Sequence, residues 1–424
     1  MNATPPITPP STPSVIPLHH HIRAMAGRDP HEPHRVATPL ELLFDLTFAT
    51  SFATAAAQMA HMLAAGHIVP GLIGFAIAAF AICWAWTNFT WFASAFDTDD
   101  WLFRVATMVQ MAGVLVLAVG LPRMFASIEH GAHLDPGVMV AGYVVMRVAM
   151  VSQWLRAARQ NPDLRTACLS YAGLILLVQV GWIGLVLADL PLVTALLAFG
   201  ALALLECAAP IIGEHIGGGT PWHPHHVAER YSLFAIIAMG EGVVGTVAAL
   251  SAAIDETGWT VDAALVCIAG LGLTFGMWWV YFMLPSAQVI HAHRDRAFPW
   301  SFTQVVIIAA IVATGAGLHV GAYFIEHEAK ISAFTALLAT VVPVAVFLCA
   351  VYGLYAYLVQ RFDGLHMLLL AGTAAVIAAA LAAAARGVPI AHCLIILMLA
   401  PVVTIVGYEW FGHRHLAEAL AEET

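Results

Sequence analysis

Four ionisable side chains lie deep within apolar stretches of this sequence: Asp45, Arg147, Glu206 and Glu241. A charge at the centre of a bilayer costs about 2.5–3.5 kcal/mol on insertion scales, so each such residue is a candidate functional site. An embedded acid can carry a proton or a cation, or it can pair with an arginine. The sequence therefore predicts proton or ion chemistry within a membrane, or buried structural ion pairs.

Asp45 belongs to the stretch Arg35 to Phe52, RVATPLELLFDLTFATSF, which opens the first long apolar segment. Thr38 precedes a proline and is followed three residues later by Glu41, a pattern that predicts an N-cap and a capping box. Asp45 lies one helical turn deeper on the same face as Glu41. Two acids one turn apart at a membrane entry need a cation, a proton or a helix N-terminus nearby. Capping accounts for Glu41, so Asp45 is the stronger functional candidate.

Glu241 lies in Gly240–Gly245, GEGVVG, which matches a dinucleotide-binding fingerprint by letters only. That fingerprint must follow a strand and open a helix, whereas these residues fall in the middle of an apolar segment. Glu241 is eleven residues past Arg230, a distance of about 16 Å along a helix. The glycines favour close helix contact, or access of water or a substrate to Glu241.

Arg147 lies near the middle of another apolar segment, where an ion pair with a buried acid is its simplest stabilising partner. Glu206 precedes Pro210 by four residues. That proline either loosens a helix locally or marks its end.

The composition predicts an integral membrane protein, because 61% of the residues are hydrophobic and only 10% are charged. Soluble domains carry about 25% charged residues. A membrane helix needs roughly 20 apolar residues. Twelve segments qualify: 40–64, 71–94, 103–121, 137–156, 168–188, 191–212, 230–251, 262–284, 301–324, 333–358, 366–385 and 389–411. We therefore expect an all-α, polytopic bundle of about 12 transmembrane helices over residues 35–412, with no soluble catalytic domain.

The placement of lysine and arginine favours cytoplasmic N- and C-termini, because twelve of the 16 basic residues then fall inside. Residues 1–34, rich in proline and histidine, are predicted to form a disordered cytoplasmic tail, and residues 413–424 a short one. Aromatic runs close the second and eighth segments. They suggest two parallel six-helix halves, 35–213 and 227–412, although aromatic belts also recur at interfaces without a repeat.

Two loops carry residues that could bind a metal. FDTDD supplies Asp97, Asp99 and Asp100, although capping of the next helix and an Asp100–Arg104 pair explain them more simply. Histidines gather in residues 222–226 and 291–293, without zinc-like spacing, and we interpret them as solvated loops. The sequence predicts no metal, no cofactor and no nucleic-acid partner.

Three blocks resemble the bacterial low temperature requirement A family of membrane proteins. They are PLELLFDLTFA in the first segment, the aromatic run into FDTDD, and the Glu229-Arg230 stretch followed by Gly240-Glu241. The matching positions are Glu41, Asp45, Asp97, Asp99, Asp100, Arg104, Glu229, Arg230 and Glu241. The family name describes growth in the cold, so the resemblance implies a type of protein and no reaction.

Three functions follow as hypotheses. The first is a transporter or channel for a small solute or ion, with Asp45, Arg147, Glu206 and Glu241 along its path. The second is a sensor or scaffold linked to cold growth, in which the buried charges are structural pairs. The third, a lipid-modifying enzyme using the acidic loop, has no specific spacing to support it. The expected location is the bacterial cytoplasmic (inner) membrane; the sequence does not give the oligomeric state or the solute.

Overall fold

The computed structural model describes residues 22–30, 32, 35–360 and 364–412. Within these ranges, twelve helices are long and apolar enough to cross a membrane. The predicted helix number and the all-helical fold are thereby confirmed. The predicted tail 413–424 and most of the predicted tail 1–34 lie outside the described residues.

The long helices begin and end near the predicted apolar segments, and several run beyond them. Their bounds are α1 (Pro39–Ala64), α2 (Ile68–Phe96), α3 (Trp101–His130), α4 (Gly137–Gln160), α5 (Arg165–Leu187), α6 (Leu192–Gly217), α7 (Pro224–Thr257), α8 (Val261–Phe282), α10 (Ala297–Ile325), α11 (Ala333–Val359), α12 (Gly364–Ala385) and α13 (Ile390–Gly407). Three short elements complete the order: α9 (Ser286–Ala292), η1 (Arg294–Arg296) and η2 (Tyr408–Gly412).

Local capping sets several helix starts. The Thr38 side chain accepts from the Glu41 backbone N–H, and Glu41 accepts from the Thr38 backbone N–H, so the predicted capping box is present. Asp100 caps α3 through the Phe103 N–H, as predicted. Pro210 lies inside α6 and does not mark its end.

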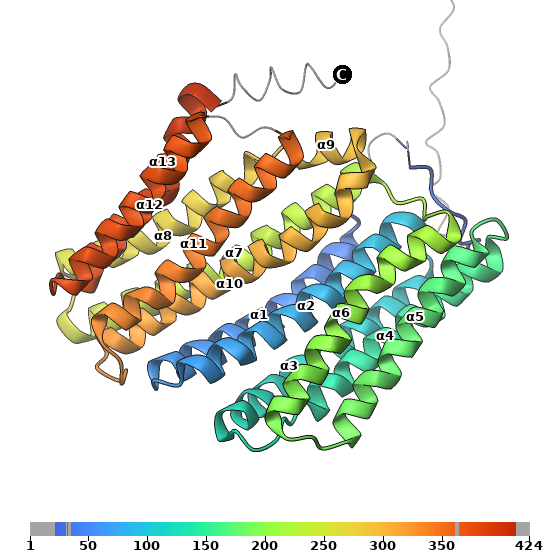
Figure 1. The fold of residues 1–424 in the computed structure, drawn as a ribbon, viewed down its shortest axis with the longest axis horizontal. Coiled ribbons are helices and arrows are strands. Elements are labelled where there is room, and N and C mark those ends of the chain that lie inside the picture. Colours follow the sequence, from blue (N-terminus) through green and yellow to red (C-terminus); the bar gives the residue numbers. More distant parts are fainter. Residues whose placement is uncertain (1–21, 31, 33–34, 361–363, 413–424) are drawn as a thin grey trace, which may run out of the picture.

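Two groups of helices flank α1 and α2 (Figure 1). On one side, α3 packs on α1 and α4, and the chain continues through neighbouring pairs to α6. On the other side, α7 packs on α8 and α10, α10 packs on α11, and α13 packs on α8 and α12. The helices α1 and α2 contact both α7 and α10, so these four helices join the two groups.

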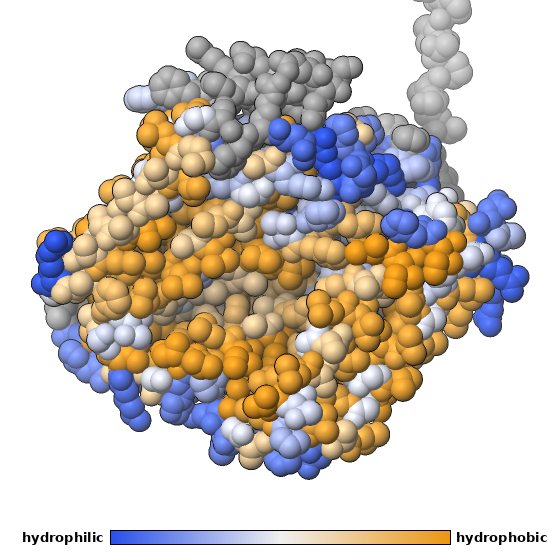
Figure 2. All heavy atoms as spheres, viewed as in Figure 1, coloured by the Kyte–Doolittle hydropathy of each residue, from blue (hydrophilic) through white to orange (hydrophobic). Residues whose placement is uncertain are grey.

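The molecular surface fits a bilayer. Figure 2 shows hydrophobic residues across the middle of the molecule and hydrophilic residues toward its upper and lower edges. Large apolar side chains of the long helices, such as Val180 and Leu204, are exposed, which a membrane protein tolerates because lipid covers them.

Residues 22–30 correct the expectation of a disordered tail up to residue 34. The Arg28 backbone N–H donates to the Ala95 carbonyl at 3.0 Å, and the Gly27 N–H donates to Asn161 at 3.0 Å. Met25 is fully buried. This short segment has no hydrophobic period of its own, so only its contacts with the ends of α2 and α4 give it a fixed conformation.

Candidate functional site

A buried charge cluster joins the starts of α1 and α7. Arg230 lies between the two acids of α1, with Nη1 2.7 Å from a Glu41 oxygen and Nη2 2.5 Å from Asp45 Oδ1. Its Nε also donates to Asp45 Oδ2 at 3.3 Å, so the Arg230–Asp45 contact is bidentate. The predicted cation for the two acids is therefore Arg230. Glu41 both caps α1 and pairs with an arginine, so capping is only part of its role.

Aromatic rings enclose this cluster. The Trp86 indole N–H donates to Asp45 Oδ1 at 2.6 Å, and the Trp86 ring stacks on Phe234 with centroids 4.1 Å apart. Phe52 lies 5.3 Å from the same Phe234 ring. Glu41, Asp45 and Arg230 are fully buried at the α1–α7 contact, which strengthens the ion pairs and raises the cost of leaving any member unpaired.

His226 is a member of the cluster that the sequence interpretation missed. Its Nε2 lies 3.2 Å from both Glu41 oxygens, and its side chain is fully buried. The expectation of a solvated loop at 222–226 is therefore wrong for His226, which lies in the first turn of α7. A signal was present: His226 precedes Arg230 by one turn, just as Glu41 precedes Asp45.

A second buried pair lies between α4 and α6. Arg147 Nη2 is 3.4 Å from Glu206 Oε2, and the Tyr143 hydroxyl accepts from Arg147 and donates to Glu206. Gln179 of α5 donates to the other Glu206 oxygen at 3.3 Å. This confirms the sequence inference that a buried acid neutralises Arg147.

Glu241 differs from the other embedded acids. It lies near the middle of α7 and is 8% exposed, yet its carboxyl makes no hydrogen bond or ion pair with any residue that the structure describes. Its backbone packs against α10, where a Cβ on Gly315 would come within 2.5 Å of the Glu241 carbonyl. Gly245 makes the next close contact, because its Cβ would lie 2.5 Å from the Gly315 oxygen. The glycines therefore provide close helix packing beside an unpaired acid.

The structure distributes the four embedded candidates over three places. Asp45 belongs to the α1–α7 cluster, Arg147 and Glu206 form one pair, and Glu241 stands apart. They do not form a single constellation of contacting side chains.

The acids Asp99 and Asp100 of the FDTDD loop, between α2 and α3, pair with arginines of the protein. Asp100 pairs with Arg156 of α4, and Asp99 pairs with Arg104 at 2.8 Å. The predicted Asp100–Arg104 pair is therefore wrong. Asp100 faces the start of α3, where it accepts from the Phe103 N–H at 2.8 Å and from the Arg23 N–H at 3.0 Å, so it cannot also reach one turn along the helix.

Asp97 is the most buried part of that loop outside the capping contacts. It accepts from the Asp99 N–H at 2.7 Å. Burial, reinforced by the negative charge of Glu41, raises the pKa of Asp97 to about 6.

The remaining polar candidates, Glu229 and the loop histidines, lie outside the buried ion pairs. Glu229 is half-buried beside the backbone of Ala37. The rings of His225 and His291 lie 4.9 Å apart. Across the described ranges of the chain, no three His, Cys, Asp or Glu side chains gather as a metal site.

Twelve membrane-length helices around buried ionisable side chains define a polytopic helical membrane protein. The chain belongs to the bacterial low temperature requirement A protein (LtrA) family, whose model matches residues 36–401. It is also similar to an uncharacterized protein of Rhizobium meliloti (strain 1021), with 24% identity over 294 residues, which cover 65% of this chain and 67% of that protein. No solved structure matches the chain.

Proposed function

We propose that the protein is a transporter or channel for a small solute or ion. The observation that carries this proposal is Glu241, a buried carboxyl near the middle of a membrane helix without a protein partner in the described chain. An isolated charge in this setting is costly, so the carboxyl must take up a proton or a cation. Such a group is suited to bind an ion in passage or to couple proton movement to a solute.

The cluster of Glu41, Asp45, His226 and Arg230 is proposed to hold the path closed at the α1–α7 contact. Two carboxylates face one guanidinium, so the protonation state of His226 decides whether the cluster is neutral or carries one negative charge. Proton uptake at the cluster would then change the strength of the contact between the two helices. Phe48 and Phe234, with ring centroids 6.1 Å apart, continue the closure along the same contact.

We further propose that the chain is built from two parallel six-helix halves, 35–213 and 227–412. Pro39, Glu41 and Asp45 in α1 correspond to Pro224, His226 and Arg230 in α7, and each pair is separated by 185 positions. Asp45 meets Arg230 and Glu41 meets His226 at equivalent positions, which is expected for two like-oriented helices beside an axis along the membrane normal. The charge bias of the loops supports a bacterial inner-membrane location with both termini in the cytoplasm.

Reconstitution tests the proposal. Purified protein in liposomes should carry a proton or ion flux after a pH jump across the membrane, and protein-free liposomes should not. Absence of flux for folded protein, over the common monovalent cations and anions, would contradict transport.

The alternative is a membrane sensor or scaffold linked to cold growth. The contacts of Arg147 with Glu206 and Tyr143 favour it, because they match a structural ion pair. This alternative predicts that no reconstituted sample carries flux, while mutations in the ion pairs change stability alone.

A further inference from the structure

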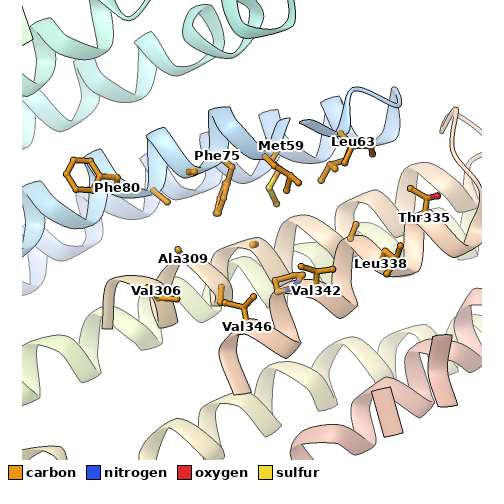
Figure 3. Close-up of a pocket in the computed structure, with 18 of the residues that line it drawn as sticks. Met59, Leu63, Phe75, Phe80, Val306, Ala309, Thr335, Leu338, Val342 and Val346 are labelled. Atoms are coloured by element: carbon orange, nitrogen blue, oxygen red, sulfur yellow. The ribbon is translucent and has the colours of Figure 1, made fainter. Parts of the chain in front are cut away.

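An apolar groove with a volume of about 500 Å³ is lined by residues of α1 and α2 on one side and of α10 and α11 on the other (Figure 3). The labelled side chains of Met59, Phe75 and Phe80 face those of Val306 and Val342 across it. Thr335 is the one residue of its lining with a hydroxyl group. The volume of the groove falls within the range of about 300–1,000 Å³ that is typical of ligand pockets.

All four helices that line the groove are of membrane-spanning length, so the groove lies at the depth of the hydrocarbon core. Water there would find almost no hydrogen-bond partners. A second groove of about 590 Å³ continues over α11 toward α12 and shares Val306, Leu338, Val342 and Val346 with the first. Two adjoining apolar channels match the two acyl chains of a diacyl lipid.

The chain's single lysine marks one end of the first groove. Lys330 adjoins Ile331, which lines the groove, and the Lys330 backbone N–H donates to the Ala64 carbonyl at 2.7 Å. That hydrogen bond joins the α10–α11 connection to the α1–α2 turn and holds the Lys330 backbone at this end of the groove. Lys330 is exposed, and its side chain forms no ion pair with the part of the chain that the structure describes.

Acids lie in the same α10–α11 connection as this lysine. Glu326 and Glu328 lie in the same connection, and Asp255 and Glu256 end α7 nearby, close enough for their charges to act on Glu326. A purely anionic headgroup would be repelled by these four carboxylates. A zwitterionic headgroup satisfies both signs, with its phosphate at Lys330 and its ammonium toward the acids.

We propose that the groove between α1, α2, α10 and α11 binds one zwitterionic phospholipid of the phosphatidylethanolamine type. Its acyl chains lie in the two adjoining grooves, and its phosphate pairs with Lys330. The site spans the contact between the α1–α2 and α10–α11 pairs, so the bound lipid stabilises that contact. The inference is independent of whether the protein transports anything.

Native mass spectrometry of the full chain tests the site, with phosphatidylethanolamine and phosphatidylglycerol added in equal amounts to the detergent-purified protein. The wild type should retain one phosphatidylethanolamine under activation that strips other lipids. Ala309→Trp should lose it, because an indole fills the groove, whereas Ala201→Trp on the exposed face of α6 should not. Lys330→Gln should lower retention by roughly tenfold, equivalent to about 1.4 kcal/mol.

Lys330→Gln keeps the test decisive if Ala309→Trp fails to fold, since Lys330 is exposed. Equal retention by the wild type and Lys330→Gln would overturn the headgroup assignment. Preferential retention of phosphatidylglycerol, or of a free fatty acid, would overturn the lipid class. Equal retention by folded Ala309→Trp would overturn the groove as the site.

Discussion

Removing one partner of the Arg147–Glu206 pair should lower stability strongly, and removing the second partner as well should restore most of it. Arg147→Met leaves Glu206 buried and without its guanidinium, so we expect the free energy of unfolding to fall by about 3–5 kcal/mol. Adding Glu206→Gln removes the uncompensated charge, and the double variant should recover most of the loss. Thermal unfolding in detergent measures both. Double and single variants of equal stability would show that the two side chains are not coupled.

The burial of Asp97 predicts that the free energy of unfolding falls as the pH rises. Because burial raises its pKa to about 6, the folded state binds this proton more tightly than the unfolded state. The stability that the protonated Asp97 contributes is therefore greatest near pH 4 and is lost as the pH rises through 6. The ionised carboxylate costs about 3 kcal/mol at pH 7, at 1.36 kcal/mol per pKa unit.

Asp97→Asn keeps the oxygen that accepts from the Asp99 N–H and removes the charge. We expect this variant to melt at a higher temperature than the wild type at pH 7 and at the same temperature near pH 4. The exposed Asp163→Asn serves as the control. A wild type and Asp97→Asn that respond identically to pH would contradict the assignment.

At the scale of the helices, the α7–α10 contact depends on glycine. A methyl group at residue 315 would lie 2.5 Å from the Glu241 carbonyl, so Gly315→Ala forces the two helices apart. We expect a loss of about 1–3 kcal/mol from overpacking. Gly321→Ala on the same helix meets nothing within 4 Å and should be neutral or stabilising. Equal melting temperatures for the two variants would show that α7 and α10 are not closely packed.

The features that could be predicted from the sequence are those that depend on residues close together in the chain. The helix number follows from hydropathy, and the caps at Thr38 and Asp100 follow from side-chain oxygens near orphan N–H groups. The wrong Asp100–Arg104 pair came from helical spacing alone, which ignores that a capping side chain faces the helix end. The packing of residues 22–30 also depends on partners that are distant in the sequence.

The charge cluster was only half predictable. Two acids at Glu41 and Asp45 required a cation, and local pattern could not show which one. The answer, Arg230, lies 185 positions from Asp45, and only tertiary packing brings them together. His226 was missed because its histidine-rich surroundings resemble a solvated loop. Its spacing from Arg230 was the available signal.

At the scale of the whole molecule, the proposed path depends on one acid. Asp45, Glu41 and Glu206 are each paired with an arginine, whereas the Glu241 carboxyl has no partner among the described residues and can exchange a proton or a cation. Loss of this carboxyl should therefore affect transport more than folding. Loss of an exposed acid outside the proposed sites should affect neither.

The most direct measurement compares Glu241→Gln with Asp163→Asn in liposomes, recording proton and ion flux after a pH jump beside the wild type. Asp163 is exposed in the connection between α4 and α5, so it is a control for charge removal. We predict flux in the wild type and in Asp163→Asn, and its loss in Glu241→Gln at unchanged melting temperature. Unchanged flux in Glu241→Gln would contradict the central role of this acid.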